Sequence, residues 1–563
     1  MATIKSPNLF FITSPRTPFK MQAEIGLLVK EFAGQKWKAN PTLQCEFMHR
    51  LAALPEFEGS FSQNDPALSA RDRITRGPKS LGLVNLDKIA LTPAGAQFLD
   101  EDLAAEALLR QLLKFQLPSP FHKENPKIAK KFCIKPYLEI VRLIYTLGRL
   151  AFDELCLFGL QLTDWHEFDR IVKDVQQFRI AKGAYKGKYK RFLQLESKRI
   201  VAGLYTEEIG SGKIRTRESR KISLDNFIKT KLRNMRDYAD ACTRYLRATG
   251  LVTVTSPGKT LSLIEQRRDD IEFILKNVDR EPVFVDNETE YCHYLFSGET
   301  PRLLTDDRVT IESRAVKCFA VGSVDLAASL PTPELKKRIQ NAMKSQREAL
   351  IDAQITELKA FGKYDDVLRV YDEITRKDAY DPPLALEWNA WRTMTMMDGG
   401  RIHANLKFDD AGNPLATAPG KNADIICDYG DFFVSVEVTL LCGEKQYDAE
   451  GEPVARHLGG LKKSTGKEAY CLFVAPKINA STISHFYALH QTKIKHYGGK
   501  SVIIPLTIKQ FVNMLTQARD CGYVPSPDRL RAFCEFSRRA ADEAEDEEEW
   551  YAAVSQKANK WLV

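Results

Sequence analysis

The chain has 563 residues, of which 44% are hydrophobic and 28% charged, and it carries a formal net charge of +8. This composition is ordinary for a globular protein and excludes a largely disordered chain, while the length predicts two to four domains. The apolar runs are shorter than the roughly 18 residues that a membrane-spanning helix needs, and the N-terminal segment lacks a signal peptide's hydrophobic region. We therefore expect a cytoplasmic protein that makes no membrane contact.

Neither the cysteines nor the histidines indicate a disulfide framework or a zinc site. The 11 cysteines form no CxxC pair, and the 9 histidines form no HExxH motif. Charge is unevenly distributed, because basic clusters crowd the first half whereas the acidic run ADEAEDEEEW (541–550) lies near the C-terminus. The basic half predicts a polyanionic partner, and the acidic run is interpreted as a solvated helix face or spacer.

The first region, residues 1–125, is predicted to combine helices with a short hairpin. The strands lie in LGLVNL (81–86) and IALT (89–92), and Thr92 with Pro93 then begins a further helix. Basic side chains stand at helical spacing just before the hairpin: Arg71, Arg73, Arg76 and Lys79. Since arginine contacts guanine bidentately and either residue type can hold a phosphate, we interpret these four as DNA-binding residues.

The second region, residues 126–265, has the element order of a winged helix. Two packed helices are predicted around Gly148, followed by one long amphipathic helix (223–250) that ends at Gly250 and by a hairpin around SPGK (256–259). Such folds place the helix in the major groove and the wing on the backbone. Two further groups are interpreted as DNA-binding, the first on the long helix and the second in a flexible loop (181–192): Lys231, Arg233, Asn234 and Arg236; Lys186, Lys188, Lys190 and Arg191.

The remaining regions are predicted to be a helical connector (266–380) and an α/β domain (381–563). Few strand signals occur in the connector, and the prolines of AYDPP (379–383) end its helical pattern. In the last region, an initial helix and a hairpin are followed by alternating helices and apolar strands, which is typical of a layered domain with a mixed sheet.

Two acids lie in the hairpin NADIICDYGDFFVSVEVT (422–439), within segments that are otherwise apolar. Asp424 begins the first strand and Glu437 lies near the end of the second, so a turn at 428–431 brings both carboxylates to one face. Hard oxygen ligands of this kind suit Mg²⁺, which can neutralise a phosphodiester and acidify a water molecule. The spacing is that of PD-(D/E)xK nucleases. The alternative is that Asp424 caps the turn and Glu437 faces solvent on an edge strand.

The hairpin departs from that nuclease pattern at two positions. Ala423 stands where proline is usual, and Thr439 stands where a lysine normally positions or deprotonates the attacking water. Four residues are candidates to replace the lysine: Lys445, Gln446, Glu450 and Glu387. The isolated histidines His457 and His496 have no partner at metal-ligand spacing and are interpreted as structural.

Longer stretches resemble the AlwI family of type IIS restriction and nicking endonucleases, nearest to its MlyI/PleI branch. The stretches that carry the resemblance extend over nearly the whole chain: TSPRTP (13–18), ALSARDRITRGPKSLG (67–82), RQLLKFQLPSPFHK (110–123), MRDYADACTRYLRATGLVT (235–253), LEWNAWR (386–392), APGKNADI (418–425), VEVTLLCGEKQYDAEGEPVARH (436–457) and YCLFVAPKI (470–478).

The resemblance implies a multidomain α+β protein with winged-helix-like recognition subdomains at 1–125 and 126–265, a helical connector at 266–380, and a PD-(D/E)xK-type nuclease domain at 381–563. It places the family's metal-site acids on Glu387, Asp424, Glu437 and Glu450, and Glu387 is expected to be a third Mg²⁺ ligand. Gln446 is a further catalytic candidate because of its position after the second strand. A valine and a threonine after the second acid are usual in this family. Within the matching stretches, Arg16 and Lys114 are also interpreted as DNA-binding.

The function expected from the resemblance is that of a bacterial, Mg²⁺-dependent type IIS endonuclease, which binds a short asymmetric duplex site such as GAGTC and cuts at a fixed offset. One active site cuts one strand, so double-strand cleavage requires a transient homodimer of nuclease domains or a small nuclease subunit. The first alternative is a strand-specific nicking enzyme, either monomeric or the large subunit of a heterodimer. The second is a winged-helix DNA-binding regulator with an inactive nuclease-like domain.

Overall fold

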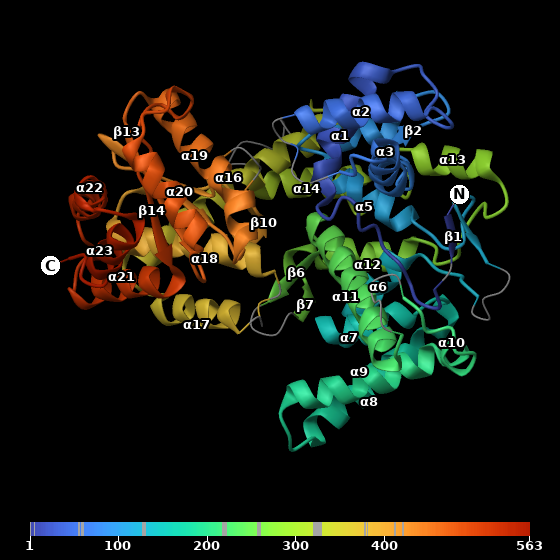
Figure 1. The fold of residues 1–563 in the computed structure, drawn as a ribbon. Helices are drawn as coiled ribbons and strands as arrows, with labels where there is room; N and C mark the ends of the chain where they lie inside the picture. Colours follow the sequence, from blue (N-terminus) through green and yellow to red (C-terminus); the bar gives the residue numbers. More distant parts are fainter. Residues whose placement is uncertain are drawn as a thin grey trace. The chain divides into compact units, whose positions relative to one another are not determined.

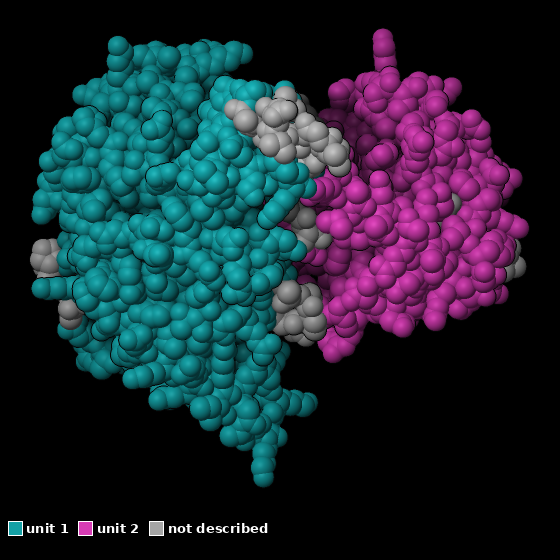
Figure 2. Space-filling model, turned by 180° about the vertical axis from the view of Figure 1, so that it is seen from behind, with its two compact units in different colours: residues 1–54, 59–343 teal, residues 55–58, 344–563 magenta. Residues whose placement is uncertain are grey.

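The chain divides into two compact units, which are coloured separately in Figure 2. Unit 1 comprises residues 1–54 and 59–343, and unit 2 comprises residues 55–58 and 344–563. The computed structural model describes these residues: 2–4, 6–54, 57, 61–125, 131–216, 222–255, 260–318, 329–376, 379, 381–409, 412–418 and 422–562. The predicted SPGK turn (256–259) lies outside this set. Within these ranges no helix combines the length and apolarity needed to cross a bilayer.

Unit 1 begins with a helical layer that carries a short hairpin, drawn in blue in Figure 1. Its helices and strands follow in chain order: β1 (Ala2–Ile4), α1 (Met21–Phe32), α2 (Pro41–Ala53), α3 (Pro66–Ile74), the π-helical turn η2 (Thr75–Lys79), β2 (Val84–Asn85), β3 (Ala90–Leu91), α4 (Pro93–Leu99), α5 (Ala104–Lys114) and β4 (His122–Glu124). The predicted cap of α4 is confirmed, because Thr92 Oγ1 accepts the Gly95 amide at 2.9 Å and Pro93 is the first helical residue.

The second part of unit 1 contains a three-stranded antiparallel sheet with the strand order β5-β7-β6. The elements around it are α6 (Pro136–Leu147), β5 (Leu150–Ala151), α7 (Phe152–Leu157), α11 (Leu224–Ala248), β6 (Val252–Thr255) and β7 (Thr260–Leu263). The predicted break at Gly148, the long helix and the following hairpin are confirmed. Gly148 and Gly250 follow the helices α6 and α11 with φ of 73° and 71°, a left-handed conformation that side chains disfavour.

The predicted flexible loop at 181–192 is wrong for most of its length. The chain forms a helical hairpin there, with α8 (Phe168–Ala184) and α9 (Tyr189–Leu204) joined by 185–188, and α10 (Thr206–Gly210) follows. Phe178 and Phe192 pack together across the hairpin with ring centroids 5.3 Å apart. This apolar contact explains why a segment rich in lysine and glycine is helical: its aromatic residues are buried against each other.

The predicted connector does not form a unit of its own, since the division between the units falls at Met343. Its first part belongs to unit 1 and contains α12 (Arg268–Asn277), α13 (Glu288–Phe296) and α14 (Arg308–Cys318). The helix α16 (Thr332–Lys359) begins in unit 1 and ends in unit 2, where α17 (Tyr364–Thr375) follows.

Unit 2 is built on a five-stranded mixed sheet in the order β14-β13-β12-β11-β8. The strands are β8 (Arg401–Ala404), β11 (Ile425–Asp428), β12 (Phe432–Val438), β13 (Glu468–Ala475) and β14 (Ile503–Thr507), and a small hairpin of β9 (Lys407–Phe408) and β10 (Pro414–Ala416) lies outside the sheet. β11 pairs antiparallel with β8 and β12, whereas β12, β13 and β14 are parallel. The predicted hairpin at 425–438 is confirmed, and β8 is an edge strand that the sequence pattern did not indicate.

Helices cover this sheet and complete the unit 2 core. They are α18 (Pro382–Asp398), α19 (Glu444–Thr465), α20 (Ala480–Gln491), α21 (Ile508–Asp520), α22 (Pro527–Glu543) and α23 (Glu547–Ala558). Since α19 and α20 are the crossovers between successive parallel strands, right-handed connections place both on one face. α18 packs on β11 and β12 and also contacts α21. The acidic run 541–550 falls at the junction of α22 and α23, where Trp550 is buried while the neighbouring acids are exposed.

Candidate active site and nucleic-acid interface

Asp424 and Glu437 lie opposite each other on adjacent strands of the unit 2 sheet. The register pairs Ile425 with Val436, so extending it by one residue places Asp424 across from Glu437. Side chains at opposed positions of an antiparallel pair project from the same face with Cβ atoms about 5 Å apart. Asp424 is fixed from both sides, since its carbonyl accepts the Asn405 amide at 3.0 Å and its Oδ2 accepts the Val438 amide at 2.8 Å.

Glu437 is buried and forms a close contact with a histidine from the neighbouring helix. Its Oε1 lies 2.8 Å from Nδ1 of His457 on α19, and the two side chains are 8% and 11% exposed. Burial lowers the pKa of His457 to about 4, and the charge of Arg456 acts in the same direction. The imidazole is therefore neutral at neutral pH. Its Nε2 is buried and has no hydrogen-bond partner among the described residues.

Two further acids, Glu387 and Glu450, act electrostatically on Glu437. Burial raises the pKa of Glu437 well above its ordinary value, and the charges of Glu450 and Glu387 raise it further. Burial also raises the pKa of Glu450, although a hydrogen bond from the Thr439 hydroxyl opposes this. Glu387, on α18, accepts the Ala418 amide at 2.9 Å through Oε2. The predicted acids are thus brought together, and Thr439 contacts one of them.

The carboxylates of this constellation are hard oxygen ligands of the kind that a divalent cation takes. Carboxylates held close together out of water resist ionisation, and a cation between them would reverse the shift that burial and mutual repulsion impose. Among the described residues no three His, Cys, Asp or Glu side chains form a ready-made metal cage. Mg²⁺ does not need one, because it binds through one or two carboxylates and keeps several waters.

The structure gives Gln446 a different environment from the acids. The residue is fully buried, and its amide nitrogen donates to the carbonyls of Leu441 and Lys477 at 2.9 Å each. Its Oε1 accepts the Asn479 amide at 2.8 Å. These bonds join the segment after β12 to the segment after β13. Gln446 therefore stabilises the loops beside the site, and its catalytic role stays a prediction.

The sequence interpretation of His457 as an isolated structural histidine missed its contact with Glu437. The sequence did contain a signal that His457 lies near the acids. His457 follows Glu450 by seven residues, or two helical turns, and the structure places both on the helix α19. Residues at that spacing share a helix face. His496, by contrast, is exposed outside the acidic cluster, and its carbonyl accepts Lys463 Nζ at 2.7 Å.

In unit 1, most of the predicted DNA-binding side chains reach solvent at least in part. The exposed ones lie in the α8–α9 hairpin, on α11, in η2 and before α1: Lys186, Lys188, Lys190, Arg191, Arg233, Arg76 and Arg16. Half-buried members have local partners. Arg71 donates to Gln44 at 2.8 Å, and Arg236 pairs with Asp153 at 3.1 Å. Asn234 is half-buried on α11. Lys79 and Lys231 lie over aromatic rings, 4.5 Å from the Phe121 centroid and 4.4 Å from the Tyr205 centroid.

Lys114 is the clearest correction, because it is wholly buried and cannot reach a nucleic acid. Its Nζ donates to the carbonyls of Tyr294, Leu295 and Ser297 at 3.2, 3.0 and 2.7 Å, which ties α5 to the end of α13. Burial lowers the pKa of Lys114 to about 6, and the charge of Arg110 adds to the shift. The helical spacing of the basic residues did not indicate that Lys114 is buried, because the segment that covers it lies 180 residues further along the chain.

Arg73 is also held inside unit 1 rather than presented to a ligand. Its Nη1 lies 2.7 Å from Oε1 of Glu24, and these side chains are 18% and 5% exposed. An arginine paired with a buried carboxylate is needed to compensate that charge. Arg73 therefore joins α3 to α1, and its prediction as a DNA contact is not supported by its environment.

Arg16 and Arg76, which are far apart in the sequence, both lie near the exposed side of α11. Arg16 is 66% exposed and its Nη2 lies 3.6 Å from Asp237 on that helix. Burial raises the pKa of Tyr238, and the charge of Arg76 opposes the rise, so this arginine is close to the same turn. The Tyr245 hydroxyl donates to the Pro15 carbonyl at 3.0 Å and holds the segment of Arg16 against α11.

Comparisons with known proteins place the chain among restriction enzymes. The model of the AlwI restriction endonuclease family matches residues 79–514. A comparison with curated proteins found no match. Among solved structures, the small subunit of the heterodimeric restriction endonuclease R.BspD6I is 31% identical over 34% of this chain and 98% of its own, with a TM-score of 0.30.

Two other solved structures are similar at lower identity. The BpuJ1 endonuclease binding domain, solved with modified DNA, is 11% identical, and the match covers 52% of this chain and 100% of that domain with a TM-score of 0.34. Restriction endonuclease FokI is 11% identical, and the match covers 94% of this chain and 98% of FokI with a TM-score of 0.23.

Proposed function

The chain belongs to the AlwI restriction endonuclease family and is a site-specific DNA nuclease, and we propose that it is a type IIS enzyme in which unit 1 binds a short asymmetric site and unit 2 hydrolyses DNA at a fixed offset. The observation that carries the proposal is the cluster of Asp424, Glu437, Glu450 and Glu387, where burial and mutual repulsion raise the pKa of Glu437. Perturbed acids gathered in one place are characteristic of catalytic sites. The enzyme would act in the bacterial cytoplasm.

We assign Mg²⁺ to Asp424 and Glu437. Glu387 would become a further ligand only by turning from the Ala418 amide, which it accepts at 2.9 Å, toward the cation. When bound, the cation would offset charge on the scissile phosphodiester and acidify a water molecule. The protein's own part is positional: the Val438 amide holds Asp424, and His457 holds Glu437. Partners that orient ligands in this way are needed for tight binding of a metal.

Glu450 is our candidate for the proton acceptor, in place of the lysine that Thr439 replaces. A general base works best when its pKa is raised toward the working pH, and burial raises the pKa of Glu450. The Thr439 hydroxyl donates to this carboxylate and so orients it. Attack of water on the phosphodiester would yield a 5′-phosphate and a 3′-hydroxyl.

The elements of unit 1 support two winged-helix-like recognition subdomains. In the second, α6, β5, α7, α11, β6 and β7 follow one another in the order of a winged helix, with α8–α10 inserted before the long helix. In the first, α3 and η2 precede the short β2–β3 hairpin. Arg16, Arg76 and Arg233 would face the duplex beside α11, and the basic α8–α9 hairpin would hold phosphates.

Run-off sequencing of cleaved DNA tests the proposal directly, with GAGTC as the first site to try. The expected result is cleavage that requires Mg²⁺ and the site, at one distance outside it. Cleavage at random positions would contradict the type IIS assignment. The absence of any Mg²⁺-dependent cleavage, with site-specific binding retained, would favour an inactive regulator.

The second candidate function is strand-specific nicking, because the acids around Glu437 would form one active site and one active site cuts one strand. A supercoiled plasmid separates the possibilities. Conversion to nicked circles that never become linear, even at high enzyme concentration, would identify a nicking enzyme, alone or as the large subunit of a heterodimer. Linear product that increases steeply with enzyme concentration would identify a transient homodimer.

A further inference from the structure

The helix α16 (Thr332–Lys359) is the element through which unit 1 continues into unit 2, because the division falls within it at Met343. Beyond Pro333 the helix contains no glycine or proline, and residues with high helix propensity dominate it. Its 28 residues span roughly 42 Å at about 1.5 Å per residue. A continuous helix of this composition is a semi-rigid spacer rather than a flexible tether.

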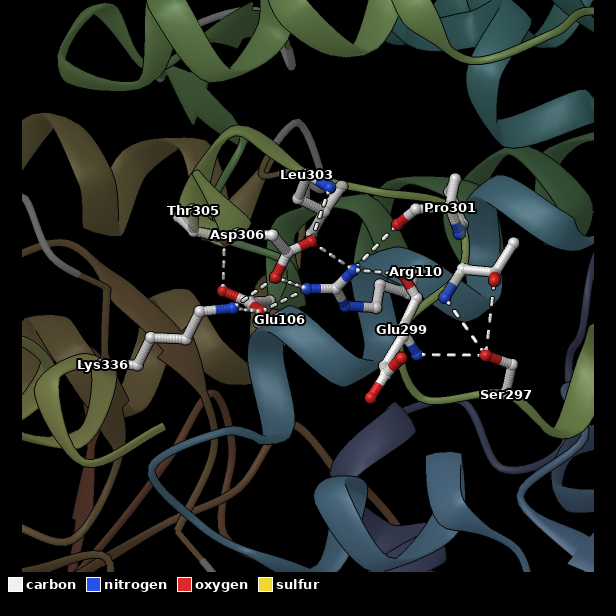
Figure 3. A network of polar contacts seen from close by, with 10 residues as sticks. Glu106, Arg110, Ser297, Glu299, Pro301, Leu303, Thr305, Asp306 and Lys336 are labelled. Atoms are coloured by element: carbon white, nitrogen blue, oxygen red, sulfur yellow. Dashed lines mark hydrogen bonds and ion pairs between the residues drawn. The ribbon is translucent and has the colours of Figure 1, made fainter. Parts of the chain in front are cut away.

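A cluster of four charged side chains fixes the start of this helix to unit 1. Lys336 Nζ lies 2.6 Å from Oε1 of Glu106 and 2.7 Å from Oδ1 of Asp306. The Arg110 guanidinium contacts the same two carboxylates at 2.7–2.8 Å. Figure 3 shows the Lys336 amine and the Arg110 guanidinium on opposite sides of the carboxylates, which they share.

The cluster is shielded from water and balanced in charge. Its side chains are 3% to 25% exposed, and Arg110 also donates to the carbonyls of Glu299 and Pro301 at 3.1 and 2.8 Å. Burial works against ionisation of Asp306, yet hydrogen bonds from Arg110 and Lys336 outweigh it and lower the pKa to about 2. Removing Lys336 would leave two shielded carboxylates facing one cation, which is costly.

Further contacts hold the first half of α16 to unit 1 and the second half to unit 2. In unit 1, Lys337 pairs with Asp100 at 2.7 Å, and Leu335 and Ile339 pack against α14. In unit 2, Arg347 donates to the Phe408 carbonyl at 3.3 Å and Gln354 donates to the Gly412 carbonyl at 3.1 Å. Each half of the helix is thus held by contacts within its own unit.

We propose that Lys336 is a positioning residue for cleavage, and that the Glu106–Arg110–Asp306–Lys336 cluster sets which phosphodiester is cut by fixing the start of α16. The inference rests on the proposed function, since it presupposes a nuclease that cuts at a fixed offset. An enzyme that cuts at a fixed distance from its recognition site needs a connecting helix whose start is held in one position on the recognition unit. The ion pairs of the cluster can hold the helix in this way, because each is a directional hydrogen bond and each carboxylate is bound by both cations.

The experiment compares cut positions of the full-length enzyme and its Lys336→Met variant by run-off sequencing on DNA with a single site. The wild type is expected to cut at one position, whereas Lys336→Met loses that single position and distributes its cuts over neighbouring phosphodiesters. Lys336→Arg can donate to both carboxylates and should restore the single position. Lys344→Met, at an exposed position of the same helix, is the matched control and should cut like the wild type.

Cleavage by Lys336→Met at the wild-type position, only more slowly, would overturn the inference and leave the cluster a purely stabilising role. Thermal unfolding and DNA affinity of each variant show whether it is folded. If Lys336→Met does not fold, Asp306→Asn, at the most exposed member of the cluster, is read by the same criterion, and an unchanged cut position in it overturns the inference. A wild type that cuts at no fixed distance would instead refute the proposed function.

Discussion

The buried acids of unit 1 and the acidic cluster of unit 2 are compensated in opposite ways. In unit 1 each of two buried acids meets a base: Arg280 contacts Glu139 at 2.6 Å, and Arg314 contacts Asp270 at 2.8 Å. In unit 2, Glu437 faces two other acids and a neutral histidine, and its pKa is raised by burial and then by these acids. Paired charges are part of the scaffold, whereas like charges gathered out of water are the feature on which the proposed cation site rests.

The largest effect is expected from substitutions in the acidic cluster of unit 2. In Asp424→Asn or Glu437→Gln, cleavage should fall by more than about 100-fold, since the loss of a residue that merely orients a metal ligand costs about 10–100-fold. DNA binding by unit 1 should persist. Single-turnover cleavage and fluorescence anisotropy measure the two properties separately. Asp431 is exposed on the same hairpin, and Asp431→Asn is the control, which should cleave like the wild type. Full activity in both Asp424→Asn and Glu437→Gln would refute the metal assignment.

The next effect concerns His457, which contacts Glu437 without being one of the acids. His457→Ala should lower the cleavage rate by about 10–100-fold, because Glu437 loses the partner that orients it. The Mg²⁺ concentration required for half-maximal cleavage should rise, a shift that a general loss of stability would not produce. His457→Asn retains a hydrogen-bonding group near Nδ1 and should recover part of the rate. Wild-type kinetics in His457→Ala would show that the contact is incidental.

A third prediction tests whether Lys114 belongs to the scaffold of unit 1. Lys114→Met removes a donor from three carbonyls, of which Leu295 keeps a hydrogen bond from Gln111 while Tyr294 and Ser297 lose the bond from Lys114. The free energy of unfolding should fall by at least about 2 kcal/mol, because an unsatisfied buried group costs about 1–3 kcal/mol. Urea denaturation measures this change. The salt dependence of DNA binding should stay the same in the folded variant. A smaller salt slope would show that the residue reaches DNA after all.

The smallest effect is expected from the exposed lysines of the α8–α9 hairpin. Replacing Lys186, Lys188 and Lys190 by alanine should reduce the slope of log K against log salt by about one unit for each phosphate that the variant no longer binds. Stability and cut position should not change, because these side chains are exposed. Binding titrations at several salt concentrations provide the measurement. An unchanged slope would exclude the hairpin from the DNA interface.

Much of the local structure follows from sequence patterns. Thr92 and Pro93 predict the start of α4, the apolar stripe predicts α11, and alternation around a turn predicts the β11–β12 hairpin with Asp424 near Glu437. These patterns succeed because caps, helical faces and strand pairs depend on residues a few positions apart.

The sequence by itself thus determined the α+β architecture, the family and the acids that a hairpin brings together. Only the tertiary structure decided which charged side chains are available. Lys114 and Arg73 have the same helical spacing as exposed basic residues, yet α13 covers the first and Glu24 of α1 neutralises the second. His457 gained its partner because α19 packs on β13, the strand that pairs with β12. Burial and pairing depend on segments distant in the chain, and helical or strand periodicity carries no information about them.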